Sequence, residues 1–207
     1  MPDVFLEDLG SLVSRETQDR ILLFESLVKK WNPVINLVSS RSLSDIRGRH
    51  IIDSVQLYKR AHGASGLWCD LGSGGGFPGL IVAILASEDN ERFRVNLVES
   101  DQRKAAFLSE AARQLDLNIQ IVASRIERLS PLSANVLSAR ALAALPKLCE
   151  FASVHLAPSG VALFPKGARF QHEIDDARQS WAFNVKVHQS QTDPSGVILE
   201  LRDIHHA

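Results

Sequence analysis

The segment DLGSGGGFPG, from Asp70 to Gly79, constrains the fold of this chain more than any other segment does. It continues an apolar run that begins at Leu67 and leads into a second apolar stretch, LIVAILA. Its glycines let the backbone turn tightly and approach a ligand without a Cβ in the way, and Pro78 suits the first turn of a helix. The sequence therefore predicts a strand, a glycine-rich loop and a helix, with a ligand held over the loop.

Beyond Leu67, short β-branched or apolar runs alternate with helical stretches. The runs are LWCDL, FRVNLVE, NIQIVA, ANVLSA and GVALF. Strands that alternate with helices of this kind predict right-handed crossovers and a parallel sheet covered by helices on both faces. The last two runs, FNVKVHQ and GVILELRD, are separated only by the turn-rich QTDPS. We expect these two to form an antiparallel hairpin at the edge of the sheet.

The N-terminal part of the chain shows helical periodicity instead. Residues 4–31 are predicted to be helical because apolar residues recur there at steps of three and four. Ser14 is the expected cap of the second helix in this range, and Pro33 its expected end. Another helix is predicted to start near Ser42, with Asp45 completing a capping box, and to continue through HIIDSVQLYKR.

A chain of 207 residues, with 45% apolar and 23% charged residues, suits one compact unit. We expect an N-terminal helical extension over residues 1–62, packed on an α/β domain over residues 63–207. The net charge of −1 gives no overall attraction for nucleic acid, so any contact with RNA requires a local basic patch.

Several classes of protein are disfavoured by what the sequence lacks. The two cysteines, Cys69 and Cys149, lie far apart and fit core positions, and no His or Cys spacing suggests a zinc site. The N-terminus MPDVFLEDLG has no signal-like region, and the apolar runs are far shorter than the ~20 residues that span a bilayer. We therefore expect a metal-free cytoplasmic protein, outside the membrane and monomeric.

The identity of the ligand over the loop follows in part from its neighbours. A dinucleotide fingerprint requires a third glycine where this chain has Phe77, and no phosphate-loop lysine follows. Glu99, at the end of the next strand, can accept hydrogen bonds from a ribose diol. Asp70 disfavours a pyrophosphate and suits the cationic end of S-adenosylmethionine. The alternatives are a tight turn without a ligand and a nicotinamide-dependent oxidoreductase.

Six strings, spaced along almost the whole chain, resemble one known family. They are WNPVINLVS at 31–39, RHIIDSV at 49–55, DLGSGGGFPG at 70–79, ESDQRKAAFL at 99–108, SARALAALPKL at 138–148 and FPKG at 164–167. In order and spacing they are similar to the RsmG family, also called glucose-inhibited division protein B, the small-subunit ribosomal RNA guanine-N7 methyltransferases. Two small departures are FPKG, where the family usually has leucine before the lysine, and NLVS, where it often has NLT.

The resemblance implies the class I methyltransferase fold, an α/β Rossmann-like architecture with a seven-stranded, mostly parallel sheet and a C-terminal antiparallel hairpin. It implies S-adenosyl-L-methionine as cofactor, with S-adenosyl-L-homocysteine as product. It also implies one guanosine in the decoding-region loop of 16S rRNA as substrate, in the 30S subunit or a precursor. The cofactor contacts that it implies are Gly72, Phe77, Ile126, Glu127 and Arg140. Reasoning from the residues themselves adds Asp70, Gly74 and Glu99 to this set.

Guanine N7 carries a lone pair in the plane of the ring, so its methylation requires position more than a base. Arg140 and Lys166 are the catalytic candidates, as hydrogen-bond donors that act on the guanine as charge develops. Their ordinary alternative is a solvated charge at a strand end. The chain lacks the Asn/Asp-Pro-Pro-aromatic string of exocyclic-amine methylation. A small-molecule methyltransferase, and a protein that keeps the cofactor without catalysis, remain alternatives.

Residues 41–60 carry a local excess of three positive charges, which bears on RNA binding. Its basic residues are Arg41, Arg47, Arg49, Lys59 and Arg60, against Asp45 and Asp53, with His50 and Tyr58 between them. Such a segment can bind phosphates, although a solvated charged face is the commoner explanation. Asp53 and His50 have a second possible role, which is to tie the extension to the sheet.

Overall fold

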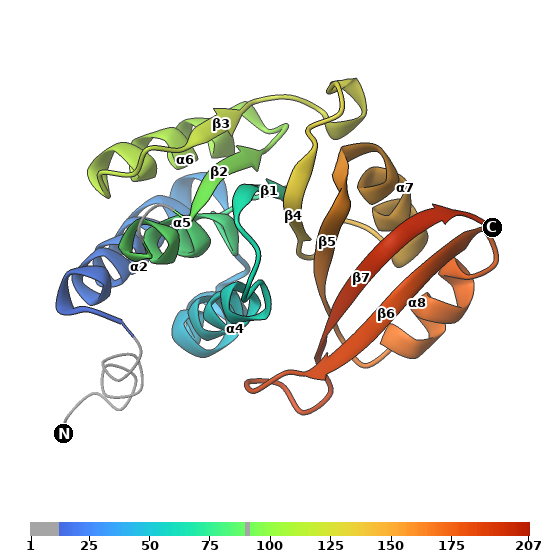
Figure 1. The fold of residues 1–207 in the computed structure, drawn as a ribbon. Coiled ribbons are helices and arrows are strands. Elements are labelled where there is room, and N and C mark those ends of the chain that lie inside the picture. Colours follow the sequence, from blue (N-terminus) through green and yellow to red (C-terminus); the bar gives the residue numbers. More distant parts are fainter. Residues whose placement is uncertain (1–12, 90–91) are drawn as a thin grey trace.

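The structure is a computed structural model that describes residues 13–89 and 92–207, except for the side chain of Arg41. Within these residues, seven strands form one sheet in the order β3-β2-β1-β4-β5-β7-β6 (Figure 1). The strands are β1 (Gly66–Leu71), β2 (Phe93–Val98), β3 (Gln120–Val122), β4 (Ala134–Ala139), β5 (Leu156–Lys166), β6 (Trp181–Gln189) and β7 (Val197–His206). The helices are α2 (Arg15–Ile35), α3 (Ser40–Leu43), the π-helix η1 (Arg47–Ile52), α4 (Asp53–Arg60), α5 (Gly79–Glu88), α6 (Gln102–Gln114), the 3-10 helix η2 (Ile126–Arg128), α7 (Leu145–His155) and α8 (Phe170–Ala177).

The topology of the sheet confirms the predicted fold class. β1 pairs in parallel with β2 and β4, and the parallel pairing continues to β3 and β5. β7 then pairs antiparallel with both β5 and β6, so the predicted hairpin closes one edge of the sheet. The switch of direction follows from the connections, because a short turn joins β6 to β7 whereas parallel strands need a crossover.

Helices cover both faces of the sheet, with an apolar cluster on each side (Figure 1). α2, α5 and α6 lie on one face, and α7 and α8 on the other. α5 is buried from Gly79 to Ala86, because the sheet lies on one side of it and α2 and α4 lie on the other. A helix enclosed in this way has no polar face, which explains the uninterrupted LIVAILA. Cys69 and Cys149 are fully buried in this core, as predicted.

The predicted end of α2 at Pro33 is wrong, since the helix continues to Ile35. Ser14 is the cap, as expected, and its side chain accepts a hydrogen bond from the Thr17 amide. Proline removes only its own donor, and burial of Ile35 holds the next turn in the helix. The helix ends instead at Asn36, whose φ of 49° is left-handed.

The predicted capping box at Ser42 and Asp45 is also wrong. The cap is Ser39, three residues earlier, whose side chain accepts from the Ser42 amide at 3.2 Å. Serine side chains cap wherever the backbone turns into a helix, so a run of three serines in four residues leaves the choice to the tertiary structure. The chain then passes through η1, a wide helical turn of a type that often lies at functional sites.

The N-terminal helices pack directly on the α/β core. α2 contacts α5 and α6, and α4 contacts α5. The apolar cluster on this face runs without interruption from these helices into the sheet. The division at residue 62 stays a prediction, and the predicted helical residues 4–12 lie outside the described residues. No helix among the described residues is both long and apolar enough to cross a bilayer.

Candidate functional site

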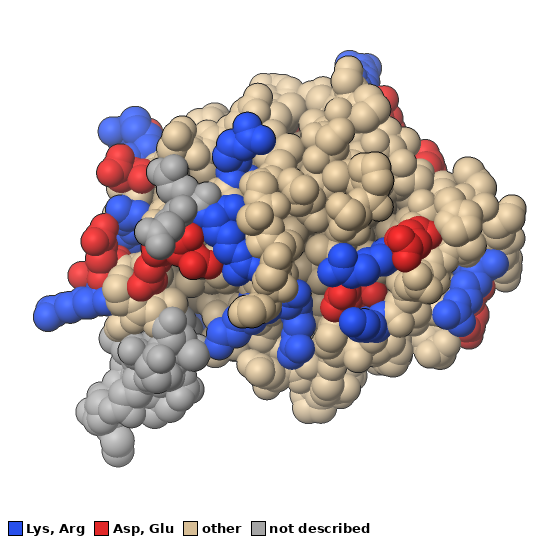
Figure 2. All heavy atoms as spheres, in the orientation of Figure 1, with Lys and Arg blue, Asp and Glu red and all other residues tan. Residues whose placement is uncertain are grey.

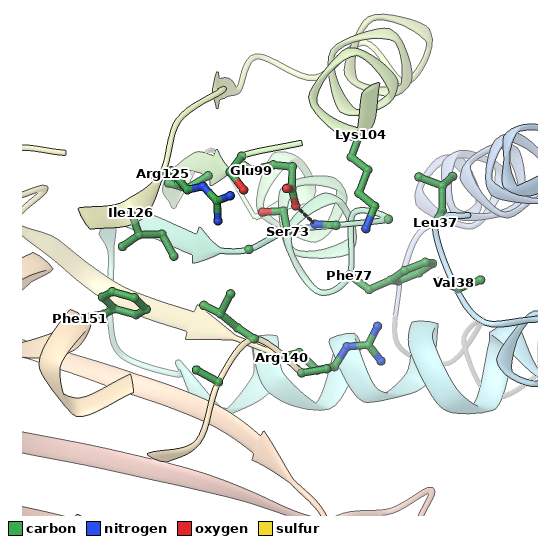
Figure 3. A pocket seen from close by; sticks show the side chains of 18 of the residues that line it. Leu37, Val38, Ser73, Phe77, Glu99, Lys104, Arg125, Ile126, Arg140 and Phe151 are labelled. Carbon is green, nitrogen blue, oxygen red and sulfur yellow. Dashed lines mark hydrogen bonds between the residues drawn. The ribbon is translucent and has the colours of Figure 1, made fainter. Parts of the chain in front are cut away.

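A cavity of about 630 Å³, here called the first pocket, lies at the carboxyl ends of β1, β2 and β4. Ligands of open α/β sheets bind at this edge. Seven residues that the sequence analysis selects for cofactor binding line it: Gly72, Gly74, Phe77, Glu99, Ile126, Glu127 and Arg140. They come from four loops that the chain order separates and the sheet brings together (Figure 3). Asp70 and Lys166 do not line this pocket.

The glycine loop packs closely on α5 on one side and leaves free space on the side of the first pocket. Gly74 and Gly76 have φ values of 53° and 89°, in the left-handed region that glycine enters without strain. A Cβ on Gly76 would lie 2.6 Å from Leu80 Cδ1, so the loop packs closely on α5. A Cβ on Gly74 would meet nothing nearer than the Gly72 carbonyl oxygen, at 3.8 Å. The loop therefore offers free space where a ligand can approach its backbone.

Glu99 joins this loop to the start of α6. One carboxylate oxygen accepts from the Gly74 amide and the other from the Asp101 amide, both at 2.8 Å. The side chain is buried but lines the first pocket. Each carboxylate oxygen can accept more than one hydrogen bond, so Glu99 can still accept from a ribose diol. The residues present therefore fit the nucleoside part of the expected cofactor.

Asp70 has a different place from the one that the sequence suggests. It is 1% exposed and lies beneath the glycine loop, where its carboxylate accepts from Ser138 Oγ at 2.7 Å and from the Gly79 amide at 3.2 Å. Burial raises the pKa of Asp70 to about 6, against the lowering effect of these hydrogen bonds. Asp70 thus fixes the junction of β1, β4 and α5, and no contact with a cationic ligand follows from its position.

One end of the first pocket suits a flat aromatic group. Ile126 and Phe151 face into it there, beside Arg125 (Figure 3). Glu127, next to Ile126, lines the same region and offers an acceptor. An apolar wall beside an acceptor is what an adenine ring with its exocyclic amine requires. Phe151 comes from α7, and no local pattern in the sequence marks it as a pocket residue.

The other end of the first pocket is formed by three stacked side chains. The His50 ring stacks on Phe77 with centroids 4.9 Å apart, and the Arg140 guanidinium carbon lies 5.7 Å from the same Phe77 ring. His50 is 8% exposed, and within the described residues neither ring nitrogen has a hydrogen-bond partner. Burial, with help from Arg140 and Arg49, lowers the pKa of His50 to about 3. The imidazole is therefore neutral at physiological pH.

A second pocket of about 380 Å³ lies beside the first and shares Arg140, Ala141 and Ala143 with it. Arg140 donates to the Arg49 carbonyl oxygen at 3.1 Å, which anchors its side chain to η1. Burial lowers the pKa of Arg140, whereas the charges of Asp53 and Asp70 act in the opposite direction. The guanidinium stays charged because its ordinary pKa is so high.

Lys166 lines the second pocket and is the last residue of β5. Its ammonium donates to Glu173 Oε2 at 2.6 Å and to the Ala143 carbonyl oxygen at 3.0 Å. With a side chain that is 8% exposed, Lys166 is held in one position rather than solvated at a strand end. The two predicted catalytic residues therefore meet at the second pocket, and only Arg140 also reaches the first.

The basic segment is less free to bind RNA than its sequence suggests. Arg47 pairs with Glu25 at 2.8 Å, Arg49 lies 3.8 Å from Asp45, and the side chain of Arg41 lies outside the described residues. Figure 2 shows Lys and Arg side chains in several groups on one face, most of them with Asp or Glu beside them. No group of three His, Cys, Asp or Glu side chains in residues 13–89 and 92–207 is placed to hold a metal ion.

Comparison with known proteins gives both the fold and the family. The fold is similar to that of a TehB-like S-adenosylmethionine-dependent methyltransferase from Corynebacterium glutamicum, with a TM-score of 0.58 and 13% identity over 87% of this chain and 98% of that one. A methyltransferase of the same cofactor class from Aquifex aeolicus has a TM-score of 0.59 and 14% identity, over 86% and 97% of the two chains. At these identities the likeness shows the fold alone.

Sequence relatives are far closer. The chain is 52% identical to the ribosomal RNA small subunit methyltransferase G of Ruegeria pomeroyi, over 93% of this chain and 94% of that protein. It is 47% identical to the protein of that name from Paracoccus denitrificans, over 94% and 99% of the two chains. The model of the GidB family matches residues 17–197. The chain therefore belongs to the family described as rRNA small subunit methyltransferase G.

Proposed function

We propose that this protein transfers a methyl group from S-adenosylmethionine to N7 of one guanosine in the decoding-region loop of 16S rRNA. Membership of the family makes the chain an S-adenosylmethionine-dependent rRNA methyltransferase. N7 as the atom, a single guanosine as the target, the 30S subunit as the substrate and a monomer as the active form are the finer parts of the proposal. The observation that supports it best is the meeting of two pockets at Arg140.

In this proposal, the first pocket holds the cofactor along its whole length. Glu99 accepts from the ribose, and Ile126, Phe151 and Glu127 surround the adenine. The glycine loop and Phe77 enclose the methionine end, close to Arg140. When bound, S-adenosylmethionine supplies an electrophilic methyl group on its sulfonium. The protein's contribution is to keep that end of the pocket open toward the second pocket.

The residues at the second pocket act by position. N7 of guanine needs no proton removed, so the protein gains most by holding the base in line with the methyl group. Arg140 and Lys166 can donate to O6, which lies next to N7 on the same edge of the ring. From the sequence, Arg140 and Lys166 are expected to act on the charge that develops on the guanine. Because methylation makes the ring positively charged, we assign these two cations the role of orienting the base instead. Their contacts with Arg49 and Glu173 fix them in place for this role.

Labelled-methyl transfer tests the proposal directly. Unmethylated 30S subunits, naked 16S rRNA and a set of free small molecules are each incubated with the protein and S-adenosylmethionine, and the label is mapped by N7-specific strand cleavage. We expect one guanosine of the decoding-region loop to carry the label. Label at another position or atom contradicts the N7 assignment, and label in a small molecule alone supports the alternative of a small-molecule methyltransferase.

A further inference from the structure

The second pocket has the location that a target base requires. It shares three wall residues with the first pocket, so a base inside it lies beside the end of the cofactor pocket that Arg140 and Phe77 form. Enzymes that modify a base take it out of the stack and hold it by hydrogen bonds to its edges. A volume of about 380 Å³ is ample for one purine.

The polar groups of this pocket include the Asp53 carboxylate, which can accept further hydrogen bonds. Asp53 lies at the start of α4, and one of its oxygens, Oδ1, accepts from Gln56 Nε2 at 3.2 Å and from the Thr192 hydroxyl. Within the described residues, both of these hydrogen bonds use Oδ1, so Oδ2 is available to a ligand. Burial raises the pKa of Asp53, which indicates that the carboxylate is poorly solvated and would gain from a donor.

Contacts between α4 and the turn that joins β6 to β7 hold Asp53 in this position. The turn between β6 and β7 approaches α4 in the fold (Figure 1), where Gln56 Oε1 accepts from the Gln191 amide at 2.8 Å and Thr192 contacts Asp53. The N-terminal helices and the C-terminal hairpin therefore meet at this pocket. Such contacts, between residues 135 and 139 positions apart, fix the acceptor relative to Lys166 and Arg140 on the sheet.

We propose that the second pocket is a guanine-binding site in which Asp53 accepts hydrogen bonds from N1–H and the exocyclic amine of the target base. This proposal rests on the proposed function. Guanine presents acceptors at N7 and O6 and donors at N1 and N2, and this pocket is lined by two cations that can donate and by a carboxylate that can accept. Adenine presents a donor in place of O6 and an acceptor at N1, so both Lys166 and Asp53 would face the wrong partner.

The charge of Asp53 also favours the reaction itself. Methylation at N7 places positive charge on the ring system, and this charge makes N1–H a stronger donor. A carboxylate fixed against N1–H is therefore bound more tightly in the transition state than in the ground state. Asp53 contributes in this way both to the choice of base and to the rate.

The substitution Asp53→Asn tests the site, because an Asn side chain keeps Oδ1 for Thr192 and Gln56 and replaces only Oδ2 and the charge. Unmethylated 30S subunits with guanine at the target position, and matched subunits with adenine there, are the two substrates. We expect kcat/KM on guanine to fall and the guanine-to-adenine ratio of kcat/KM to fall by about 10- to 100-fold. The Kd for S-adenosylmethionine, from calorimetry, should stay unchanged.

Asp175→Asn is the matched control, since Asp175 is an exposed acid on α8 that accepts from Gln171 of the same helix and does not line the second pocket. It should leave the ratio and both rates near wild type. A purely structural role of Asp53 would lower both rates together and leave the ratio unchanged, which would overturn the guanine site alone. If the wild-type protein labels no single guanosine in 30S subunits, the proposed function fails, and this proposal fails with it.

Discussion

The two pockets differ in how the chain builds them. The first is built around the loops that directly follow β1 to β4, where glycines and amides held by Glu99 form its central part, and His50 and Phe151 complete its two ends. The second is made by side chains from α4, the end of β5, α8 and the β6–β7 turn. The first pocket therefore centres on backbone at the ends of the parallel strands, whereas the second is lined largely by side chains that α4 and the β6–β7 turn bring to β5 and α8.

This difference separates the features that the protein shares with other methyltransferases of the same fold from the features that set its substrate. The solved methyltransferases with the same fold are only 13 to 14% identical to this chain. A core that binds one cofactor can serve many substrates, because function depends on the site rather than on the fold. We expect changes in the first pocket to affect cofactor binding and changes in the second to affect RNA methylation, with Arg140 common to both.

The substitution Arg140→Ala should have the largest effect, because this residue lines both pockets. We expect the single-turnover rate of methylation at saturating cofactor to fall about 100- to 1000-fold, through misplacement of the base relative to the methyl group. Arg103→Ala, which removes an exposed arginine on α6, is the control. A rate within a few-fold of wild type would show that the two pockets do not cooperate through Arg140.

Alanine substitutions at Gly76 and at Gly167 compare the glycine loop, which packs on α5 beside the first pocket, with the backbone of the second pocket. Gly76→Ala places a methyl group 2.6 Å from Leu80 Cδ1 at a φ of 89°, and should lower the free energy of unfolding by about 2–4 kcal/mol. Gly167 lines the second pocket and has nothing within 4 Å of an added Cβ, so Gly167→Ala should be nearly neutral. Urea titrations measure both; equal losses of stability would contradict the contrast.

Glu99→Gln tests the first pocket by itself. One carboxylate oxygen becomes an amide NH2 group, which cannot accept from a backbone N–H, so we expect the Kd for S-adenosylmethionine to rise about 10- to 100-fold. The rate at saturating cofactor should change less. Glu110→Gln, on α6 and outside the first pocket, is the control for calorimetry. An unchanged Kd would remove Glu99 from the proposed cofactor contacts.

Lys166→Met tests the second pocket by itself. Methionine keeps the apolar stem but not the ammonium, so we expect kcat/KM on 30S subunits to fall about 10-fold, as for the loss of one charged hydrogen bond. Cofactor affinity should not change, because Lys166 does not line the first pocket. Lys186→Met on β6 controls for the loss of an exposed lysine. A weaker cofactor affinity in Lys166→Met would contradict the separation of the pockets.

Asp70 should affect stability alone, through the pH dependence of the free energy of unfolding. Its pKa is raised from 3.8 to about 6 in the folded protein, so the folded state binds the proton more tightly than the unfolded state. Between these two values, stability should decrease as pH rises, by up to about 1.4 kcal/mol per pH unit, and the decrease should be complete above pH 6. Asp70→Asn lacks this dependence. A flat difference between the two proteins from pH 4 to 7 would contradict the assignment.

Much of the fold could be predicted because its signals are local. Each strand of the sheet matches an apolar run, and the cap of α2 at Ser14 is set by the residue itself. The two errors, at Pro33 and at Ser42, lie where several neighbouring residues could end or begin a helix. At these two places, the burial of Ile35 and the position of Ser39 decided where the helix ends or begins. Neither feature is visible in a local sequence pattern.

By itself, the sequence determined the order of the strands along the chain, the glycine loop and the residues that follow each parallel strand. These follow from local backbone preferences and from the rule that such strands end at one edge of the sheet. Only the tertiary structure decided that Asp70 is buried beneath the loop and that Phe151 and His50 line the first pocket. It also brought Asp53, Arg140 and Lys166 to one pocket, because the packing of α4 and the β6–β7 turn beside β4 and β5 sets those distances.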